Sequence, residues 1–311
     1  MILLEVNGLK KAFGSRKAVN GASFTVRRGE VFGLLGPNGA GKSTTISLIC
    51  GVLKANAGSV VVDGFSVGTD GANAKKRIGI VPQEPALYPT LSARANLRFW
   101  GTINDVPADE LEEAVNYVLQ VVGLVDRADE KIAKFSGGMK RRLNIAAGLI
   151  HSPKLLIMDE PTVGIDPQSR NHILETVKNL KDKDITVIYT SHYVEEVEYL
   201  CDRVAVMDNG EIIAEGTLPE LLEQGSQFQE LTISVDTIPD EIENAIQALP
   251  HAEEVIVQNE QLKLVTSNAE KLLPSAFAAI IGLGGTVSEI KIHKPNLESL
   301  FLKLTGKALR D

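Results

Sequence analysis

The sequence has few of the features that mark disulfide-rich, zinc-binding or membrane-spanning proteins. Only two of its 311 residues are cysteines, Cys50 and Cys201, and they lie far apart in apolar segments without metal-ligand spacing. We therefore expect reduced core cysteines in a cytoplasmic protein, and no zinc site. No apolar run reaches the roughly 18 residues of a membrane span. The first residues, Met1–Asn7, lack a basic region and predict a strand rather than a signal peptide.

Positive charge is also scarce. The chain has 32 Lys and Arg against 40 Asp and Glu, which gives a formal net charge of −8. Proteins that bind the nucleic-acid backbone broadly need a basic face, so we expect no nucleic-acid partner. An apolar content of 44% and a charged content of 23% are instead typical of a soluble globular protein, and the length allows two domains.

A glycine-rich stretch near the N-terminus is the strongest signal. Residues Gly36-Pro-Asn-Gly-Ala-Gly-Lys-Ser-Thr44 match the phosphate-binding pattern Gly-x-x-x-x-Gly-Lys-Ser. An apolar run typical of a buried strand, Val31–Leu35, precedes the stretch, and a helical pattern, Thr44–Leu53, follows it. This strand–loop–helix context favours a phosphate site over a turn without a ligand.

The residue types of this loop explain how it would bind a triphosphate. Its glycines let backbone N–H groups turn inward, and the following helix adds partial positive charge at its N-terminus. Lys42 would reach the β- and γ-phosphates, and the Ser43 hydroxyl would ligate Mg²⁺.

Strand and helix patterns alternate over residues 1–225 and predict an α/β domain. Apolar or alternating runs predict strands at Ile2–Val6, Ala22–Val26, Val31–Leu35, Ser59–Asp63, Lys75–Gln83, Lys154–Met158, Asp184–Thr190, Arg203–Met207 and Glu211–Glu215. Phe13 would lie in a loop, Lys10–Ser15. A helical subdomain is expected at about 84–152, with helices at Ser92–Trp100, Pro107–Val122 and Ser136–Ile150. Pro107 would occupy a first helical turn, and Ser136 an N-cap. Further helices are expected at Ser169–Leu180 and Val194–Cys201.

The pattern changes after a boundary near Gly225. Residues 226–311 read β-α-β-β-α-β, with the first helix starting at Asp240, and predict a small α+β ferredoxin-like domain. A last amphipathic helix is expected at Asn296–Leu304. The region has no cluster of catalytic residue types, so we expect an accessory domain without an active site of its own.

Polar residues follow several of the predicted buried strands. Asp159 and Glu160 come after the strand at 154–158, and ligands of α/β folds bind at the carboxyl ends of strands. Asp159 could hold Mg²⁺, and Glu160 could polarise an attacking water. His192 follows the next buried strand and could contact the same γ-phosphate, although a lone histidine is more often structural.

Two further positions stay open on the residues alone. Phe13 could stack on an adenine, or it could fix its loop to the core. Gln83 ends a predicted strand and could reach a metal or a water, or it could be a solvated surface group.

Together these motifs resemble the nucleotide-binding subunits of ATP-binding cassette (ABC) transporters over roughly residues 2–220. Gly36–Thr44 resembles the Walker A loop, and Leu155–Glu160 resembles Walker B with its catalytic glutamate. Phe135-Ser-Gly-Gly-Met139 is similar to the Leu-Ser-Gly-Gly-Gln signature, with its first and last residues replaced, and Gly164–Asp166 is similar to the D-loop. The resemblance implies a P-loop NTPase (RecA-like) core with an antiparallel β subdomain and a helical subdomain.

The resemblance also implies roles for single residues. Glu160, the switch histidine His192 and the Q-loop Gln83 would be catalytic. Mg²⁺ would be held by Ser43, Gln83 and Asp159. The residues implied to contact ATP are Phe13, Gly36, Pro37, Asn38, Gly39, Ala40, Gly41, Lys42, Ser43, Thr44, Ser136, Gly137, Gly138 and Asp166.

The resemblance further implies partners. In the family, the helix start at Ser136–Gly138 completes the ATP site of the opposing subunit, and this chain has one copy of each motif. We expect a homodimer, or a heterodimer with a related subunit, bound peripherally to integral membrane permease subunits on the inner face of the cell membrane. A permease coupling helix would dock beside Gln83–Trp100, although these apolar side chains could instead form the subdomain's own core.

The C-terminal tail points to a class of transporter. Pro295–Gly306 and Leu309–Asp311 resemble the tail of drug-resistance ATPases, which implies export of an antibiotic, drug, lipid-like or related amphipathic compound. The alternative is a soluble ABC ATPase acting on DNA or ribosomes, but such proteins usually carry a coiled-coil insertion, a zinc motif or two cassettes. Glu160 and His192 disfavour a module that only binds nucleotide, and a nucleotide kinase would not need the helix start at Ser136.

Overall fold

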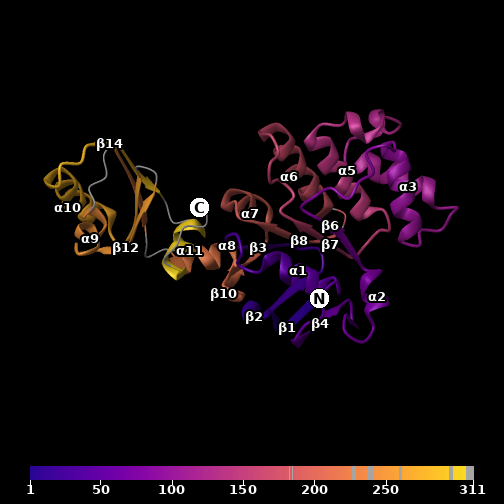
Figure 1. The fold of residues 1–311 in the computed structure, drawn as a ribbon, viewed down its shortest axis with the longest axis horizontal. Coiled ribbons are helices and arrows are strands. Elements are labelled where there is room, and N and C mark those ends of the chain that lie inside the picture. Colours follow the sequence, from indigo (N-terminus) through magenta and orange to yellow (C-terminus); the bar gives the residue numbers. More distant parts are fainter. Residues whose placement is uncertain are drawn as a thin grey trace. The chain divides into compact units, whose positions relative to one another are not determined.

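The structure is a computed structural model. It describes residues 1–181, 183, 185–225, 229–236, 241–258, 261–293 and 297–305. The chain divides into two compact units, Met1–Glu215 and Gly216–Asp311, whose elements are labelled in Figure 1. The division precedes helix α8 (Leu218–Gly225), whereas the sequence predicted a boundary after it. Helix α8 packs on α11 (Leu297–Thr305) within the second unit.

A six-stranded sheet forms the centre of the first unit, in the order β10-β9-β3-β8-β7-β6. Its strands are β3 (Val31–Leu35), β6 (Ile78–Val81), β7 (Leu155–Asp159), β8 (Thr186–Ser191), β9 (Arg203–Asp208) and β10 (Glu211–Thr217). The pairs β9–β3, β3–β8, β8–β7 and β7–β6 are parallel. Parallel strands that are covered on both faces need apolar side chains throughout, which explains their continuous apolar runs.

Helices cover one face of this sheet, and a second sheet with α1 (Lys42–Ile49) lies on the other (Figure 1). The helical face carries α3 (Ala93–Ile103), α4 (Leu111–Val121), α5 (Gly137–Leu149), α6 (Pro167–Lys181) and α7 (Val194–Leu200). The second sheet is antiparallel, in the order β2-β1-β4-β5. Its strands are β1 (Ile2–Phe13), β2 (Arg16–Arg27), β4 (Ala57–Val62) and β5 (Phe65–Ser66), and a short helix, α2 (Gly71–Lys75), follows them.

Strand β7 shows how one segment serves both layers. Leu156 and Met158 join the core beneath the helices, whereas Leu155 and Ile157 join the core beneath the antiparallel sheet. Successive side chains of a strand point to opposite faces, so a fully apolar run fills both cores. Each such side chain contributes about 1.5–3 kcal/mol when it is fully buried. The end of β7 is therefore held rigidly, and this is where Asp159 lies.

Several predicted boundaries are wrong. The strand predicted at Lys75–Gln83 covers only Ile78–Val81, because Lys75 ends α2, and the strand predicted at Ala22–Val26 begins at Arg16. Residues 10–13 continue β1 instead of forming a loop, because β2 pairs with them as far as Phe13, opposite Arg16. Pro107 lies outside α4, which begins at Leu111, because it closes a turn in which Glu110 N donates to the Pro107 carbonyl. The predicted N-cap is confirmed, since Ser136 Oγ accepts a hydrogen bond from Met139 N.

The second unit contains a four-stranded antiparallel sheet in the order β12-β13-β11-β14. Its elements are β11 (Gln229–Val235), α9 (Ile242–Gln247), β12 (Ala252–Gln258), β13 (Gln261–Thr266), α10 (Ala269–Gly282) and β14 (Val287–His293). Side chains of α9 and α10 share one core with this sheet. The ferredoxin-like arrangement stays a prediction that is compatible with this order. Asp184, Asp240, Pro295, Asn296 and Gly306–Asp311, which earlier predictions used, lie outside the described residues.

Within the described ranges, none of the helices combines the length and the apolar character that a transmembrane segment requires.

Candidate functional site

The loop between β3 and α1 is shaped by close contact with its neighbours. A Cβ atom at Gly36 would overlap the carbonyl oxygen of Met207, and one at Gly41 would overlap that of Ala18. Gly41 also has a φ of 109°, which other residues avoid. It occupies the N-cap of α1 and has no side chain to bond the first N–H groups of the helix. These groups can therefore serve a phosphate.

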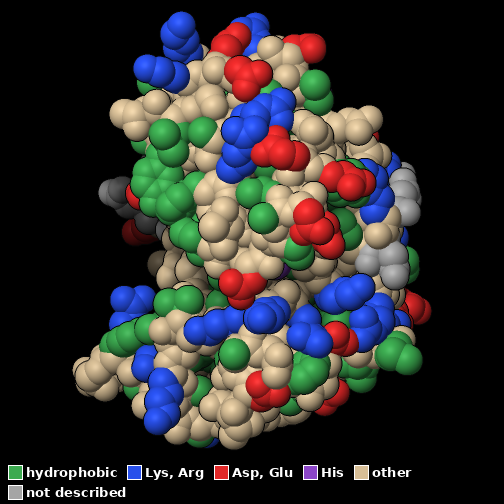
Figure 2. Space-filling model, turned by 90° about the vertical axis from the view of Figure 1, so that its right-hand side faces the viewer, with side chains coloured by type: hydrophobic (Ala, Val, Ile, Leu, Met, Phe, Trp, Pro, Cys, Tyr) green, Lys and Arg blue, Asp and Glu red, His purple; other side chains and the backbone are tan. Residues whose placement is uncertain are grey.

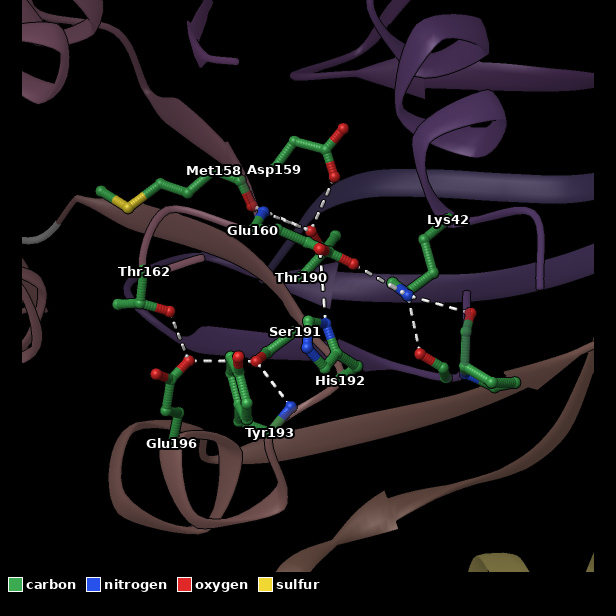
Figure 3. Close-up of polar contacts among 12 residues, drawn as sticks. Lys42, Met158, Asp159, Glu160, Thr162, Thr190, Ser191, His192, Tyr193 and Glu196 are labelled. Atoms are coloured by element: carbon green, nitrogen blue, oxygen red, sulfur yellow. Dashed lines mark hydrogen bonds and ion pairs between the residues drawn. The ribbon is translucent and has the colours of Figure 1, made fainter. Parts of the chain in front are cut away.

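Lys42 points across the mouth of this loop. Its ammonium group donates to the carbonyl oxygens of Gly36, at 2.6 Å, and Pro37, at 3.1 Å. The same Nζ atom lies 3.1 Å from Glu160 Oε1, and only 5% of the lysine is exposed (Figure 3). A cation that is this well buried is held by partial and full negative charges, which phosphate oxygens can replace.

The two acidic residues after β7 are fixed through Thr190 of β8. The Thr190 hydroxyl donates to Asp159 Oδ1 at 2.8 Å, and it accepts a hydrogen bond from Glu160 N at 2.9 Å. Glu160 is buried and has a φ of 45°, a conformation that costs a non-glycine residue about 1–3 kcal/mol. This bend aims its carboxylate at Lys42 on one side. On the other side Oε2 lies 3.3 Å from His192 Nδ1, although the two are not aligned as a hydrogen bond.

A cavity of about 450 Å³ joins the loop to residues from distant segments. Phe13 at the end of β1, Gln83 after β6 and Glu160 after β7 all line it, together with residues 38–44. Arg16 also lines the cavity and was missed in the sequence, since only the β1–β2 register brings it opposite Phe13. Half of the Phe13 side chain is exposed, so its ring is available for stacking rather than fixed in the core.

The residues of the signature-like segment lie elsewhere. Ser136 and Gly137 are exposed at the start of α5, and neither they nor Gly138 and Asp166 line the loop cavity. A Cβ atom at Gly138 would overlap the side chain of Ser169, so α5 packs tightly on the start of α6. Asp166 Oδ1 in turn accepts a hydrogen bond from Ser169 N at 2.9 Å. The predicted ATP contacts therefore form two separate groups within one chain.

Comparisons with known proteins place this arrangement in a family. Residues 19–163 match the ABC transporter family. The linearmycin resistance ATP-binding protein LnrL of Bacillus subtilis (strain 168) is 50% identical to this chain over 311 residues, which cover 99% of this chain and 100% of that protein. This chain belongs to the ATP-binding subunits of ABC transporters. The Nod factor export ATP-binding protein I of Rhizobium sp. (strain N33) is 38% identical, over 99% of this chain and 98% of its own length.

Solved structures of ABC subunits share the fold. One is cbiO1 from Clostridium perfringens, part of the ABC transporter complex cbiONQ. It is 32% identical, with a TM-score of 0.66 over 72% of this chain and 91% of its own. Another ATP-binding subunit of an ABC transporter is 31% identical, with a TM-score of 0.65 over 71% of this chain and 92% of its own. These findings confirm the predicted P-loop NTPase fold. The predicted ATPase activity is confirmed with the family.

The oxygen donors of this ABC subunit suit a magnesium nucleotide. Ser43 and Gln83 line the cavity. Asp159 is the last residue of β7 and directly precedes Glu160. Hydroxyl, amide and carboxylate oxygens are the ligands that Mg²⁺ prefers, usually together with substrate phosphates and waters. Over the described residues, no group of three or more His, Cys, Asp and Glu side chains could hold a metal. A magnesium ion held by Ser43, Gln83 and Asp159 would take its remaining ligands from the nucleotide and from waters.

Proposed function

We propose that this chain is the motor ATPase of an exporter for an antibiotic, drug, lipid-like or related amphipathic compound, and that it works as a homodimer. One observation carries the proposal: Lys42 and Glu160 meet at 3.1 Å at a cavity that Phe13 and Gln83 also line. Export is supported by the relatives, one of which is named for linearmycin resistance and the other for Nod factor export.

The phosphate loop and Lys42 hold the triphosphate. The first N–H groups of α1 and the Lys42 ammonium bind its oxygens, and Phe13 stacks on the adenine. Ser43, Gln83 and Asp159 would hold Mg²⁺, whose positive charge would offset the negative charge of the triphosphate. The present contacts of Lys42 with the Gly36 and Pro37 carbonyls are exchanged for phosphate contacts.

Glu160 then acts on the attacking water. When Lys42 turns to the phosphates, the Glu160 carboxylate loses a cation at 3.1 Å and becomes a free acceptor for the water proton. Its backbone stays fixed because Glu160 N remains bonded to Thr190 Oγ1. His192 lies beside Oε2 and orients the carboxylate and the γ-phosphate.

A second protomer completes the site. Ser136 and Gly137 are exposed at the start of α5, so their N–H groups are open to a partner's γ-phosphate. Asp166 lies next to this helix start, through its bond with Ser169. Closure of the two protomers excludes bulk water from around the triphosphate. It also aligns the single attacking water molecule that Glu160 activates.

The permease docks in a groove at the edge of the parallel sheet. The groove has a volume of about 280 Å³, and its apolar lining includes Ile80, Pro82, Ala86 and Trp100. Trp100 is held in place because its indole nitrogen donates to the Ala86 carbonyl at 2.9 Å. Figure 2 shows this face hollowed across its middle, with Lys and Arg side chains along the lower rim. A short permease helix in this groove would hold the chain at the inner face of the membrane.

Co-purification from membranes tests the proposal. The tagged chain should recover multi-span membrane proteins. Ile80→Glu places a charge in the groove, so it should lower that recovery about tenfold without changing ATP binding. Val52→Glu is the matched control, since Val52 is 71% exposed outside the groove. A partner set of only soluble or ribosomal proteins would support an ABC ATPase that acts on DNA or ribosomes.

A further inference from the structure

A buried carboxylate lies outside the nucleotide cavity and has no role in the mechanism above. Glu196 of α7 is 2% exposed (Figure 3). Its Oε2 atom accepts hydrogen bonds from Thr162 Oγ1 at 2.9 Å, Tyr189 OH at 2.9 Å and Ser191 Oγ at 3.0 Å. Its Oε1 atom accepts from Arg170 Nε at 2.5 Å. One side chain thus accepts from four donors that lie in three segments of the chain: the turn after β7, α6 and β8.

A carboxylate matches these donors well, because it has two acceptor oxygens, a full negative charge and no hydrogen of its own. Burial and the adjacent Glu196 carboxylate raise the pKa of the Tyr189 phenol, so this hydroxyl stays protonated and donates. Arg170 offers only N–H donors, because a guanidinium group has no acceptor atom. An amide at position 196 would place its NH₂ either against the Arg170 N–H or at the position of the Oε2 acceptor that the three hydroxyls share. The cluster is therefore matched to glutamate and not merely to a polar side chain of that size.

Two of the donors lead to the ATP-hydrolysing residues. Thr162 follows Glu160 across Pro161, so its bond to Glu196 anchors the turn after the proposed base. Ser191 directly precedes His192, and its Oγ also accepts from Tyr193 N at 2.9 Å. This closes the turn that presents His192, as the sticks in Figure 3 show.

The third donor leads to the face proposed to meet the partner. Arg170 lies in α6, and its guanidinium carbon stands 4.3 Å from the Tyr193 ring centroid. Its neighbour Ser169 bonds Asp166 and packs on Gly138 of the signature-like segment. A shift of the start of α6 would therefore move Arg170 and change its contacts with both Glu196 and Tyr193.

We propose that Glu196 is a positioning residue that couples the start of α6 to the turn of His192, and so sets His192 against Glu160 when the partner protomer arrives. The inference rests on the proposed function of His192 and Glu160. Glu196 itself touches no residue of the nucleotide cavity in the contacts described above. Its effect should therefore appear in the rate of hydrolysis and not in nucleotide affinity.

A double-mutant cycle on the full chain, in complex with its transporter partners, tests this. Glu196→Gln should lower kcat about 10- to 100-fold and change the Kd for ATP–Mg²⁺ by less than about twofold. In a His192→Ala background the same change should lower kcat by less than about twofold, because the residue it positions is already gone. Glu195→Gln is the matched control, since Glu195 lies on the same helix with its side chain exposed, and it should keep wild-type kcat.

Several outcomes would overturn the inference. An equal loss of kcat in both backgrounds would show that Glu196 does not act through His192, and would leave the proposed roles of His192 and Glu160 intact. Wild-type rates in His192→Ala alone would contradict the proposed role of His192 and this inference with it. If Glu196→Gln does not fold, Ser191→Ala removes the donor that precedes His192, and it should lower kcat severalfold with the same dependence on His192.

Discussion

Glu160 occupies a backbone conformation that side chains other than glycine rarely adopt. Its positive φ places the residue at the turn that leaves β7, and Thr190 holds the turn from the neighbouring strand. The resulting strain, about 1–3 kcal/mol, is tolerated because the strand ends on both sides are buried. The strained backbone orients the Glu160 carboxylate so that one oxygen lies beside Lys42 and the other beside His192.

Glu160→Gln is expected to separate binding from hydrolysis. The amide keeps the shape and removes the base, so kcat should fall at least about 100-fold. ATP–Mg²⁺ should still bind, because the phosphate contacts come from Lys42 and the loop, and the bound form should accumulate as a dimer in size-exclusion chromatography. Glu113→Gln, on the exposed side of α4, serves as the control. Unchanged turnover would assign the base to another residue.

Single residues also show where sequence reasoning reached its limit. Lys42, Glu160 and Gln83 could be predicted as site residues because their signals are local. The signal is a fixed pattern for Lys42 and a polar residue after a predicted strand for the other two, and all three line one cavity in the structure. Arg16 and Glu196 were missed. Arg16 depends on the register of a hairpin, and Glu196 depends on contacts that lie up to 34 positions away along the chain. No periodicity encodes such contacts.

At the scale of elements, the predicted strands before Glu160 and His192 were placed well because buried parallel strands are continuous apolar runs, whereas the strand predicted at Lys75–Gln83 covers only Ile78–Val81. The hairpin tip and the start of α4 were not placed well. Residues 10–13, Lys-Lys-Ala-Phe, are mostly exposed and do not alternate between apolar and polar, so only pairing with β2 shows that they form a strand. Pro107 permits both a first helical turn and the bend that it forms here, and the sequence does not distinguish the two.

The contact between β6 and α5 is an element-scale property that can be tested. A Cβ atom at Gly79 would overlap the carbonyl oxygen of Gly148, so strand and helix touch along their backbones. Gly79→Ala should destabilise the fold by about 1–3 kcal/mol in urea unfolding. It should also lower ATPase activity, because β6 leads directly to Gln83. Gly71→Ala is the control, since nothing lies within 4 Å of its Cβ position. Equal stabilities of the two variants would show that β6 and α5 can move apart at Gly79 and Gly148 at little cost in free energy.

At the scale of the whole molecule, one chain holds two groups of proposed ATP contacts that do not meet within it, and on our proposal each group is one half-site. The loop cavity contains Lys42, and the start of α5 exposes Gly137 elsewhere. In a twofold dimer each site would take its loop from one protomer and its helix start from the other. Damage to one half-site should therefore be repaired by a partner that is damaged only in the other.

Mixing two inactive variants tests this directly. Lys42→Ala should lose ATP binding at its own loop and keep its helix start. Gly137→Asp should fold, because the nearest side-chain atom to its Cβ is 3.8 Å away and an acidic residue suits a helix N-terminus. Its charge should repel the partner's γ-phosphate. Random pairing makes half of the dimers mixed, each with one intact site, so the mixture should recover about a quarter of the wild-type ATPase rate. Full activity of either variant alone, or no recovery on mixing, would contradict a site shared between protomers.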